Sequence, residues 1–149
     1  MWPLLLLGVG ALLIKAFSEE NSDKKDKKIF ISFSMKDRQY RDFLVQQAKK
    51  DKSPFNFTDM SVNEPWDEEK WKRECRKWIS KCDGMIVLLS KNTWHSKGTR
   101  WEIKCANELG LKIIGLHIKK EDKGAIPPEL DGKIIEWTWN NLDKAIKKI

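Results

Sequence analysis

The stretch MIVLLSKNTWHSKGTRWEIKCANEL, residues 85–109, decides the fold of this chain. It opens with a continuous apolar run, which is typical of a strand buried on both faces of a parallel sheet. Residues 90–98 are polar and predict a loop, which holds Trp94 and a histidine. Thr99 then opens a segment with helical spacing, and Glu102 falls in its first turn. A buried strand, a loop and a helix with an acidic start are the parts of a ligand-binding mouth in open α/β sheets.

Strand and helix patterns alternate on both sides of this stretch. We predict strands at residues 28–33, 55–58, 85–89, 112–118 and 133–137, and helices at 38–49, about 66–81, from 99, and from a cap at 140. Alternating units of this kind predict a parallel sheet with helices on both faces. We therefore expect a flavodoxin-like α/β fold, an open sheet of five parallel strands in the order 2-1-3-4-5. Its switch point would lie between the first and third strands.

The N-terminal residues differ from the rest. Residues 2–14 carry no charge, and a polar, mixed-charge stretch follows at 18–27. A signal peptide, a buried helix and a short membrane anchor all fit this pattern, although ~20 apolar residues are usual for a membrane span. We predict a hydrophobic helix at 1–17 that anchors the chain, a linker at 18–27 and a globular domain at 28–149. Lysines clustered at 24–28 would then place the domain in the cytoplasm, at the cell inner membrane. A wholly cytoplasmic protein is the alternative.

Composition narrows the function classes. The chain of 149 residues has a formal net charge of +7, but its basic residues do not form a stripe with interleaved aromatics, so nucleic acid is not an expected partner. The three cysteines, Cys75, Cys82 and Cys105, have no zinc spacing and fall on predicted inward helix faces. We expect buried, reduced thiols and no metal site.

Motifs for the common chemistries of this fold class are missing from the sequence. It has no Gly-rich phosphate loop and no dinucleotide fingerprint. A phosphorelay receiver needs an aspartate at the end of the third strand, where this chain has Leu88, Leu89 and Ser90. One carboxylate, Glu102, remains near the predicted mouth. Position alone would make it a partner of the helix dipole.

A family resemblance changes this interpretation of Glu102. The segments KIFISFSMKD (28–37), MIVLLSKNT (85–93) and TRWEIKCANELG (99–110) resemble the TIR-like domains of bacterial antiphage systems, of the Thoeris type. The resemblance covers roughly residues 28–148. It implies cleavage of NAD+ at the nicotinamide–ribose bond, with Glu102 as the catalytic residue.

The resemblance also implies the remaining site residues. Three predicted loops meet at the switch point, at residues 34–37, 59–65 and 90–99. Substrate binding would involve side chains in or next to these loops: Phe33, Ser34, Asp59, Ser61, Trp94 and Trp101. Related domains often carry an aromatic residue four positions before the glutamate, where this chain has Gly98. Either tryptophan could replace that ring, or a neighbouring copy could complete the pocket.

The expected partners follow from the same resemblance. NAD+ would be the substrate, with no bound cofactor, and the product would be ADP-ribose or a cyclic ADP-ribose type signal that a downstream effector reads. Self-association through the TIR-like domain and membrane contact through residues 2–17 are also expected. The alternative function is a non-enzymatic TIR adaptor that acts by self-association and recruits partners.

Overall fold

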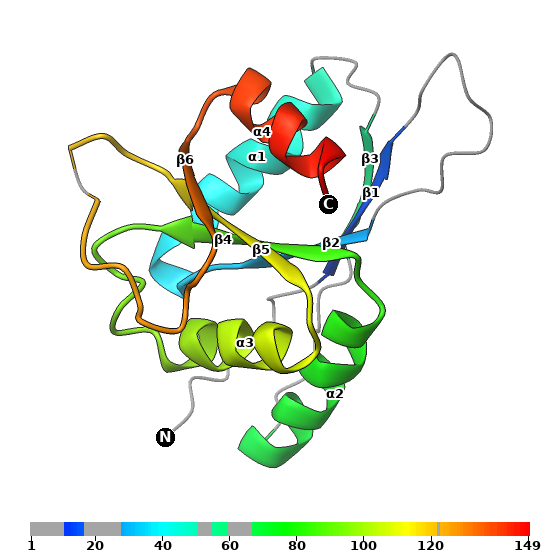
Figure 1. The fold of residues 1–149 in the computed structure, drawn as a ribbon, viewed down its shortest axis with the longest axis vertical. Helices are drawn as coiled ribbons and strands as arrows, with labels where there is room; N and C mark the ends of the chain where they lie inside the picture. The colour runs from blue at the N-terminus through cyan, green and yellow to red at the C-terminus, as the bar shows by residue number, and fades with distance from the viewer. Residues whose placement is uncertain (1–10, 17–27, 51–54, 60–66, 122) are drawn as a thin grey trace.

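Six strands form one sheet in the computed structural model, which describes residues 11–16, 28–50, 55–59, 67–121 and 123–149. The strand order is β3-β1-β2-β4-β5-β6 (Figure 1). The strands are β1 (Ala11–Ala16), β2 (Lys28–Ser32), β3 (Phe55–Asp59), β4 (Gly84–Leu89), β5 (Lys112–His117) and β6 (Lys133–Glu136). The helices are α1 (Arg38–Lys50), α2 (Glu68–Ser80), α3 (Lys97–Glu108) and α4 (Trp139–Lys147), with a short 3-10 helix η2 (Met35–Asp37) before α1.

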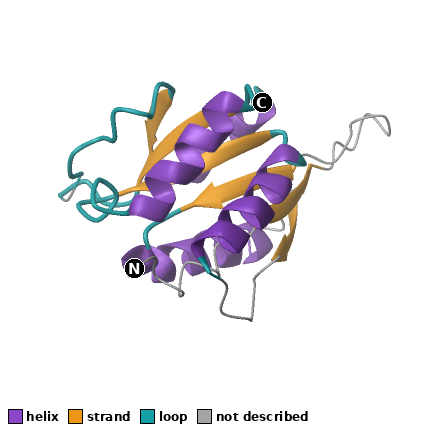
Figure 2. Ribbon diagram, turned by 90° about the horizontal axis from the view of Figure 1, so that it is seen from below, coloured by secondary structure: helices purple, strands orange, loops and turns teal. Residues whose placement is uncertain are grey.

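Helices cover both faces of the sheet, as alternating strands and helices predict. Helices α1 and α4 lie on one face, and α2 and α3 lie on the other (Figure 1). Viewed onto the second face, α2 and α3 lie side by side across the strands (Figure 2). The α/β class is therefore confirmed.

The parallel part of the sheet contains four strands, so the prediction of five was wrong. Strands β2, β4, β5 and β6 pair in parallel, in the order that the sequence predicted for them. Strand β1 lies between β2 and β3 and pairs antiparallel with both. It separates the two strands that we expected to be neighbours.

Strand β1 also corrects the prediction of an N-terminal helix. A short apolar run does not distinguish a helix from a buried strand, and here residues 11–16 supply hydrogen bonds to the facing edges of β2 and β3. The other residues of the predicted anchor, 1–10 and 17, and the whole of the predicted linker, 18–27, lie outside the described residues. Within the part of the chain that the structure describes, no helix has the length and apolar character needed to cross a membrane.

The core is centred on β4, all six residues of which are buried. Phe30 and Ile31 of β2 and Ile103 of α3 are fully buried beside it. The three cysteines are buried and free, as predicted. Phe43 of α1 is 53% exposed and makes a T-shaped contact with the Tyr40 ring.

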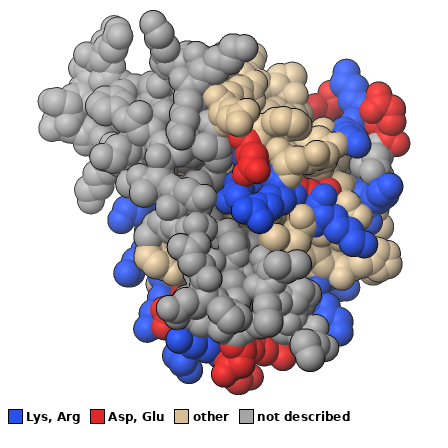
Figure 3. Space-filling model, turned by 180° about the vertical axis from the view of Figure 1, so that it is seen from behind, with Lys and Arg blue, Asp and Glu red and all other residues tan. Residues whose placement is uncertain are grey.

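Charge is mixed over the described surface. The face opposite to the view of Figure 1 shows lysines and arginines next to aspartates and glutamates (Figure 3). The excess of positive charge is therefore not gathered into one continuous patch among the residues coloured there.

Candidate functional site

Parallel strands β2 and β4 are neighbours, and the segments that leave their carboxyl ends meet. The first is Phe33–Asp37 after β2, and the second, the third loop of the predicted mouth, is Ser90–Ser96 after β4. Asp37, only 2% exposed, joins them. Its Oδ2 accepts a hydrogen bond from Ser90 Oγ at 2.6 Å, and its Oδ1 accepts one from Asn92 Nδ2 at 2.9 Å. The predicted switch point is thus built around a buried carboxylate.

Hydroxyl groups fix the path of the third loop. Thr93 Oγ1 accepts from Ser90 N at 2.9 Å and donates to the carbonyl oxygen of Leu88 at 3.0 Å. Ser96 then caps α3, because its Oγ accepts from Thr99 N. The helix begins at Lys97, two residues before the predicted start, so Glu102 lies in its second turn rather than its first.

Glu102 points into the protein, between β2, α2 and α3. Its side chain is 1% exposed. Ser32 Oγ, at the end of β2, donates to Glu102 Oε1 at 2.7 Å, and Cys75 Sγ, on α2, lies 3.4 Å from Glu102 Oε2 as the second donor. Both carboxyl oxygens therefore contact groups of the protein itself.

Burial dominates the electrostatics of this cluster. Desolvation raises the pKa of Glu102 from its ordinary value of 4.5 to about 8, although the hydrogen bonds from Ser32 and Cys75 work in the opposite direction. The pKa of the Cys75 thiol is raised well above its usual value, first by burial and then by the charge of Glu102. Near pH 7 the buried cluster of Glu102, Ser32 and Cys75 therefore favours a neutral carboxylic acid beside a neutral thiol.

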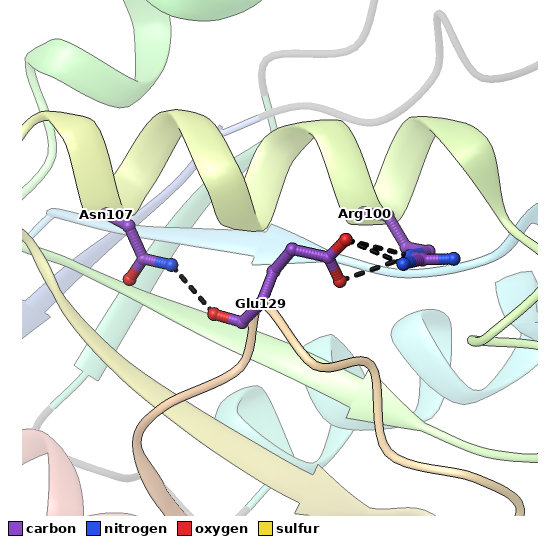
Figure 4. Close-up of polar contacts among 3 residues, drawn as sticks. All are labelled: Arg100, Asn107 and Glu129. Atoms are coloured by element: carbon purple, nitrogen blue, oxygen red, sulfur yellow. Dashed lines mark hydrogen bonds and ion pairs between the residues drawn. The ribbon is translucent and has the colours of Figure 1, made fainter.

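Trp94 is the exposed aromatic residue of the third loop, with 37% of its surface exposed. The Arg100 guanidinium lies 4.8 Å from the centre of its ring. Arg100 in turn makes a two-pronged ion pair with Glu129, whose shortest contact is 2.7 Å (Figure 4). Asn107 lies about two turns further along the same face of α3 and donates a hydrogen bond to the carbonyl oxygen of Glu129 at 2.7 Å (Figure 4). Glu129, in the segment before β6, thus positions Arg100, which in turn stacks on the Trp94 ring.

A glycine lets the same segment approach the third loop. Gly124 has a φ of +64°, and a Cβ atom there would lie 2.5 Å from the carbonyl oxygen of Ser90. Only glycine fits such a contact without a backbone shift. The third loop is therefore held by Asp37 on one side and by residues 124–129 on the other.

Among the described side chains, Phe33, Ser34 and Trp101 make their contacts with residues other than Glu102. Phe33 is buried beneath the Arg41 guanidinium, and Ser34 caps η2 through Lys36 N. Trp101 packs against Trp71 of α2, with ring centres 5.2 Å apart. Asp59 ends β3, where its backbone pairs with Leu12, and Ser61 lies outside the described residues.

A cavity of about 410 Å³ lies at the amino ends of strands β5 and β6, opposite to the candidate site. It is formed where β5 and β6 begin and α3 and α4 end, and Lys112, Lys133 and Asp131 line it. Since ligands of open α/β sheets bind at the carboxyl ends of the strands, this cavity is not part of the candidate site.

Sequence reasoning missed the residues that surround Glu102. Ser32 was only a polar residue inside an apolar strand, and Cys75 was predicted to be a buried thiol without a partner. Asp37 was not among the predicted site residues, although it joins the segments that follow β2 and β4. Polar residues at the end of a central strand were the signal that could have identified Ser32.

Comparison with known families gives one finding on identity. The family model described as "Thoeris protein ThsB, TIR-like domain" matches residues 30–123, which is more than half of the chain. The match includes the last three residues of β2, all of β4 and α3, and both loops of the site. Comparison with curated proteins gives no significant match.

Proposed function

Because this chain belongs to the family of TIR-like domains of the Thoeris protein ThsB, we propose that it cleaves NAD+ in antiphage defence, with Glu102 as the catalytic residue. The observation that carries the proposal is the position of Glu102. Asp37 and Glu102 are the two buried carboxylates of the described residues, and Asp37 is engaged in joining two loops. Glu102 is the one that remains for chemistry, beside the carboxyl end of β2.

Cleavage of the nicotinamide–ribose bond needs only one carboxylate from the protein. Nicotinamide leaves NAD+ as a neutral molecule, so the bond can break without a general acid, and positive charge develops on the ribose. An ionised carboxylate placed against that ribose stabilises the charge electrostatically. Water then adds to give nicotinamide, ADP-ribose and a proton. Attack by an atom of the same molecule instead gives nicotinamide, a cyclic ADP-ribose isomer and a proton.

The binding residues belong to the proposal as well. Trp94 offers an exposed flat ring on the third loop, held by Arg100, and suits stacking on a base or on nicotinamide. Ser34, Asp59 and Ser61 would contact the nucleotide from the first and second loops. Phe33 and Trp101 would support the site from beneath, since both pack against neighbouring side chains. Self-association and an effector that reads the product complete the proposed system.

Nicotinamide release from NAD+ by the purified full chain tests the proposal. We expect Glu102→Gln to lower release by at least about 100-fold, since it removes the charge aimed at the transition state. Glu121→Gln is the matched control, because Glu121 is an exposed glutamate that makes no contact with α2 or with Glu102 in the interactions described here. Release that is equally fast in wild type and Glu102→Gln would refute the assignment.

A non-enzymatic adaptor is the second candidate, and the burial of Glu102 favours it. A carboxylate that is 1% exposed contacts no ligand in this arrangement. If this second function is correct, extracts of phage-infected cells that express the chain will keep their NAD+ level, and Glu102→Gln will protect cells as well as wild type does. Loss of protection in Glu102→Gln supports the enzyme.

A further inference from the structure

The two oxygens of Glu102 are both occupied, one by Ser32 and the other by Cys75. NAD+ can reach the carboxyl only if one of these partners leaves. The proposed function therefore requires either Ser32 or Cys75 to move away from Glu102.

Ser32 cannot leave without breaking the sheet. It is fully buried, and its backbone pairs with Val87 of β4, the most buried strand. Glu102 is equally fixed, because Ile103, Cys105 and Ala106 anchor α3 in the core. Movement on either side would expose many apolar side chains at once.

Helix α2, which carries Cys75, is held differently. It packs chiefly against α3, without a comparable contact to any strand of the described residues. Its ring and polar contacts with α3 are the tilted Trp71–Trp101 pair, the exposed Arg76–Glu108 ion pair at 2.9 Å and the Cys75–Glu102 contact. Arg76 Nη1 also lies 3.7 Å from Cys105 Sγ. An exposed ion pair contributes little, whereas the Trp71–Trp101 pair is a ring contact between the two helices within one turn of Cys75.

The C-terminal end of α2 is fixed more firmly. Asp83, just before β4, donates its N–H to the carbonyl oxygen of Lys28 at 2.7 Å, and its Oδ2 accepts from Lys28 N at 2.8 Å. Ile79 is fully buried at the same end. Figure 1 shows one end of α2 beside the start of β4 and the other extending past α3, away from the sheet.

We propose that α2 is a movable cover over Glu102, hinged near Asp83, and that the arrangement described here is the closed, resting form of the site. An outward swing of α2 separates Cys75 from Glu102 and opens the carboxyl group to the ligand-binding mouth. The inference rests on the proposed function, since it concerns the same glutamate. It gives the protein a resting state in which NAD+ is not consumed.

Two cysteines of the chain report on this movement. Cys75 lies under the cover and Cys82 lies at the hinge, and they are 5% and 6% exposed. Burial raises the pKa of both thiols, so both are slow to react with an alkylating reagent in the closed form. A swing about the hinge exposes Cys75 and leaves Cys82 buried, whereas unfolding exposes both.

The experiment measures alkylation of each cysteine in the full chain by N-ethylmaleimide, with the sites separated by peptide mass spectrometry. We expect Cys75 to react faster than Cys82 in the wild type. Trp71→Ala, which removes the aromatic contact, should raise the Cys75 rate by roughly tenfold with little effect on Cys82. Arg76→Ala is the milder variant if Trp71→Ala does not fold, with an expected increase of about twofold.

Equal alkylation rates at Cys75 and Cys82, in the wild type and in the folded variants, would contradict the proposal that α2 is a movable cover. The readout does not depend on catalysis, so the two proposals fail separately. Selective exposure of Cys75 without nicotinamide release would keep the cover and remove the enzymatic role of Glu102.

Discussion

Glu102 carries a contradiction between its burial and its proposed task. A carboxylate that stabilises positive charge must be ionised, yet in the closed cluster burial raises its pKa to about 8. Moving α2 away would return solvent or substrate polarity to the side chain and lower that pKa. In the proposed mechanism exposure and ionisation of Glu102 are therefore one event, which would make the closed form inactive for two physical reasons.

The raised pKa has a measurable consequence for stability. Between pH 4.5 and about 8 the folded chain keeps the Glu102 proton while the unfolded chain has lost it, so this group makes the free energy of unfolding fall as pH rises. The slope from this residue reaches about 1.4 kcal/mol for each pH unit.

Glu102→Gln removes this titration, and the variant should become more stable than wild type as pH rises. Urea unfolding at pH 5, 6.5 and 8 measures the difference, which we expect to be small at pH 5 and at least about 1 kcal/mol at pH 8. A difference that stays constant over this range would show that Glu102 is not buried as a neutral acid.

At the scale of elements, the third loop is shaped by its neighbours more than by its own sequence. Asp37 of η2 binds its first residues, Gly124 packs against its backbone, and Glu129 holds the arginine under Trp94. These contacts come from two parts of the chain that are far from each other in sequence, η2 and residues 124–129. The loop is thus positioned before any ligand arrives.

Asp37→Ala should therefore loosen the loop. It removes the acceptor for Ser90 and Asn92 and leaves buried polar groups unpaired, a cost of about 1–3 kcal/mol in the free energy of unfolding. Asp37→Asn keeps one acceptor oxygen and should lose less. Chemical denaturation compares both with Asp131→Ala, an exposed aspartate whose replacement should change stability by under about 0.5 kcal/mol. Equal losses in Asp37→Ala and Asp131→Ala would contradict the role given to Asp37.

The whole molecule shows which features a sequence can predict. The parallel order of β2, β4, β5 and β6 follows from alternating patterns and from the all-apolar β4, both of which are local in sequence. The surroundings of Glu102 are not local: Ser32 is 70 residues away and Cys75 is 27. No periodicity reports such pairings. Strand β1 was missed because an apolar run of its length suits a helix as well as a buried strand.

The central position of β1 in the sheet predicts that a substitution in this strand destabilises the whole fold. Leu13→Pro removes a backbone donor from a strand with a neighbour on each side, which a central strand does not tolerate. We expect a loss of more than about 3 kcal/mol in the free energy of unfolding, measured by thermal or urea denaturation. A membrane anchor outside the fold would behave differently, because the same change would leave the domain as stable as before.

Strand β1 also sets an order of events during synthesis. It leaves the ribosome before both of its partners, and β3 ends at Asp59, 43 residues after β1 ends at Ala16 (59 − 16). At typical elongation rates this leaves the apolar segment waiting roughly 2–9 s for its second neighbour. Until β2 emerges both edges of this segment are unpaired, and the edge that β3 later covers stays unpaired for the whole interval. We therefore expect slower translation of residues 17–59 to increase the fraction of chains lost to aggregation.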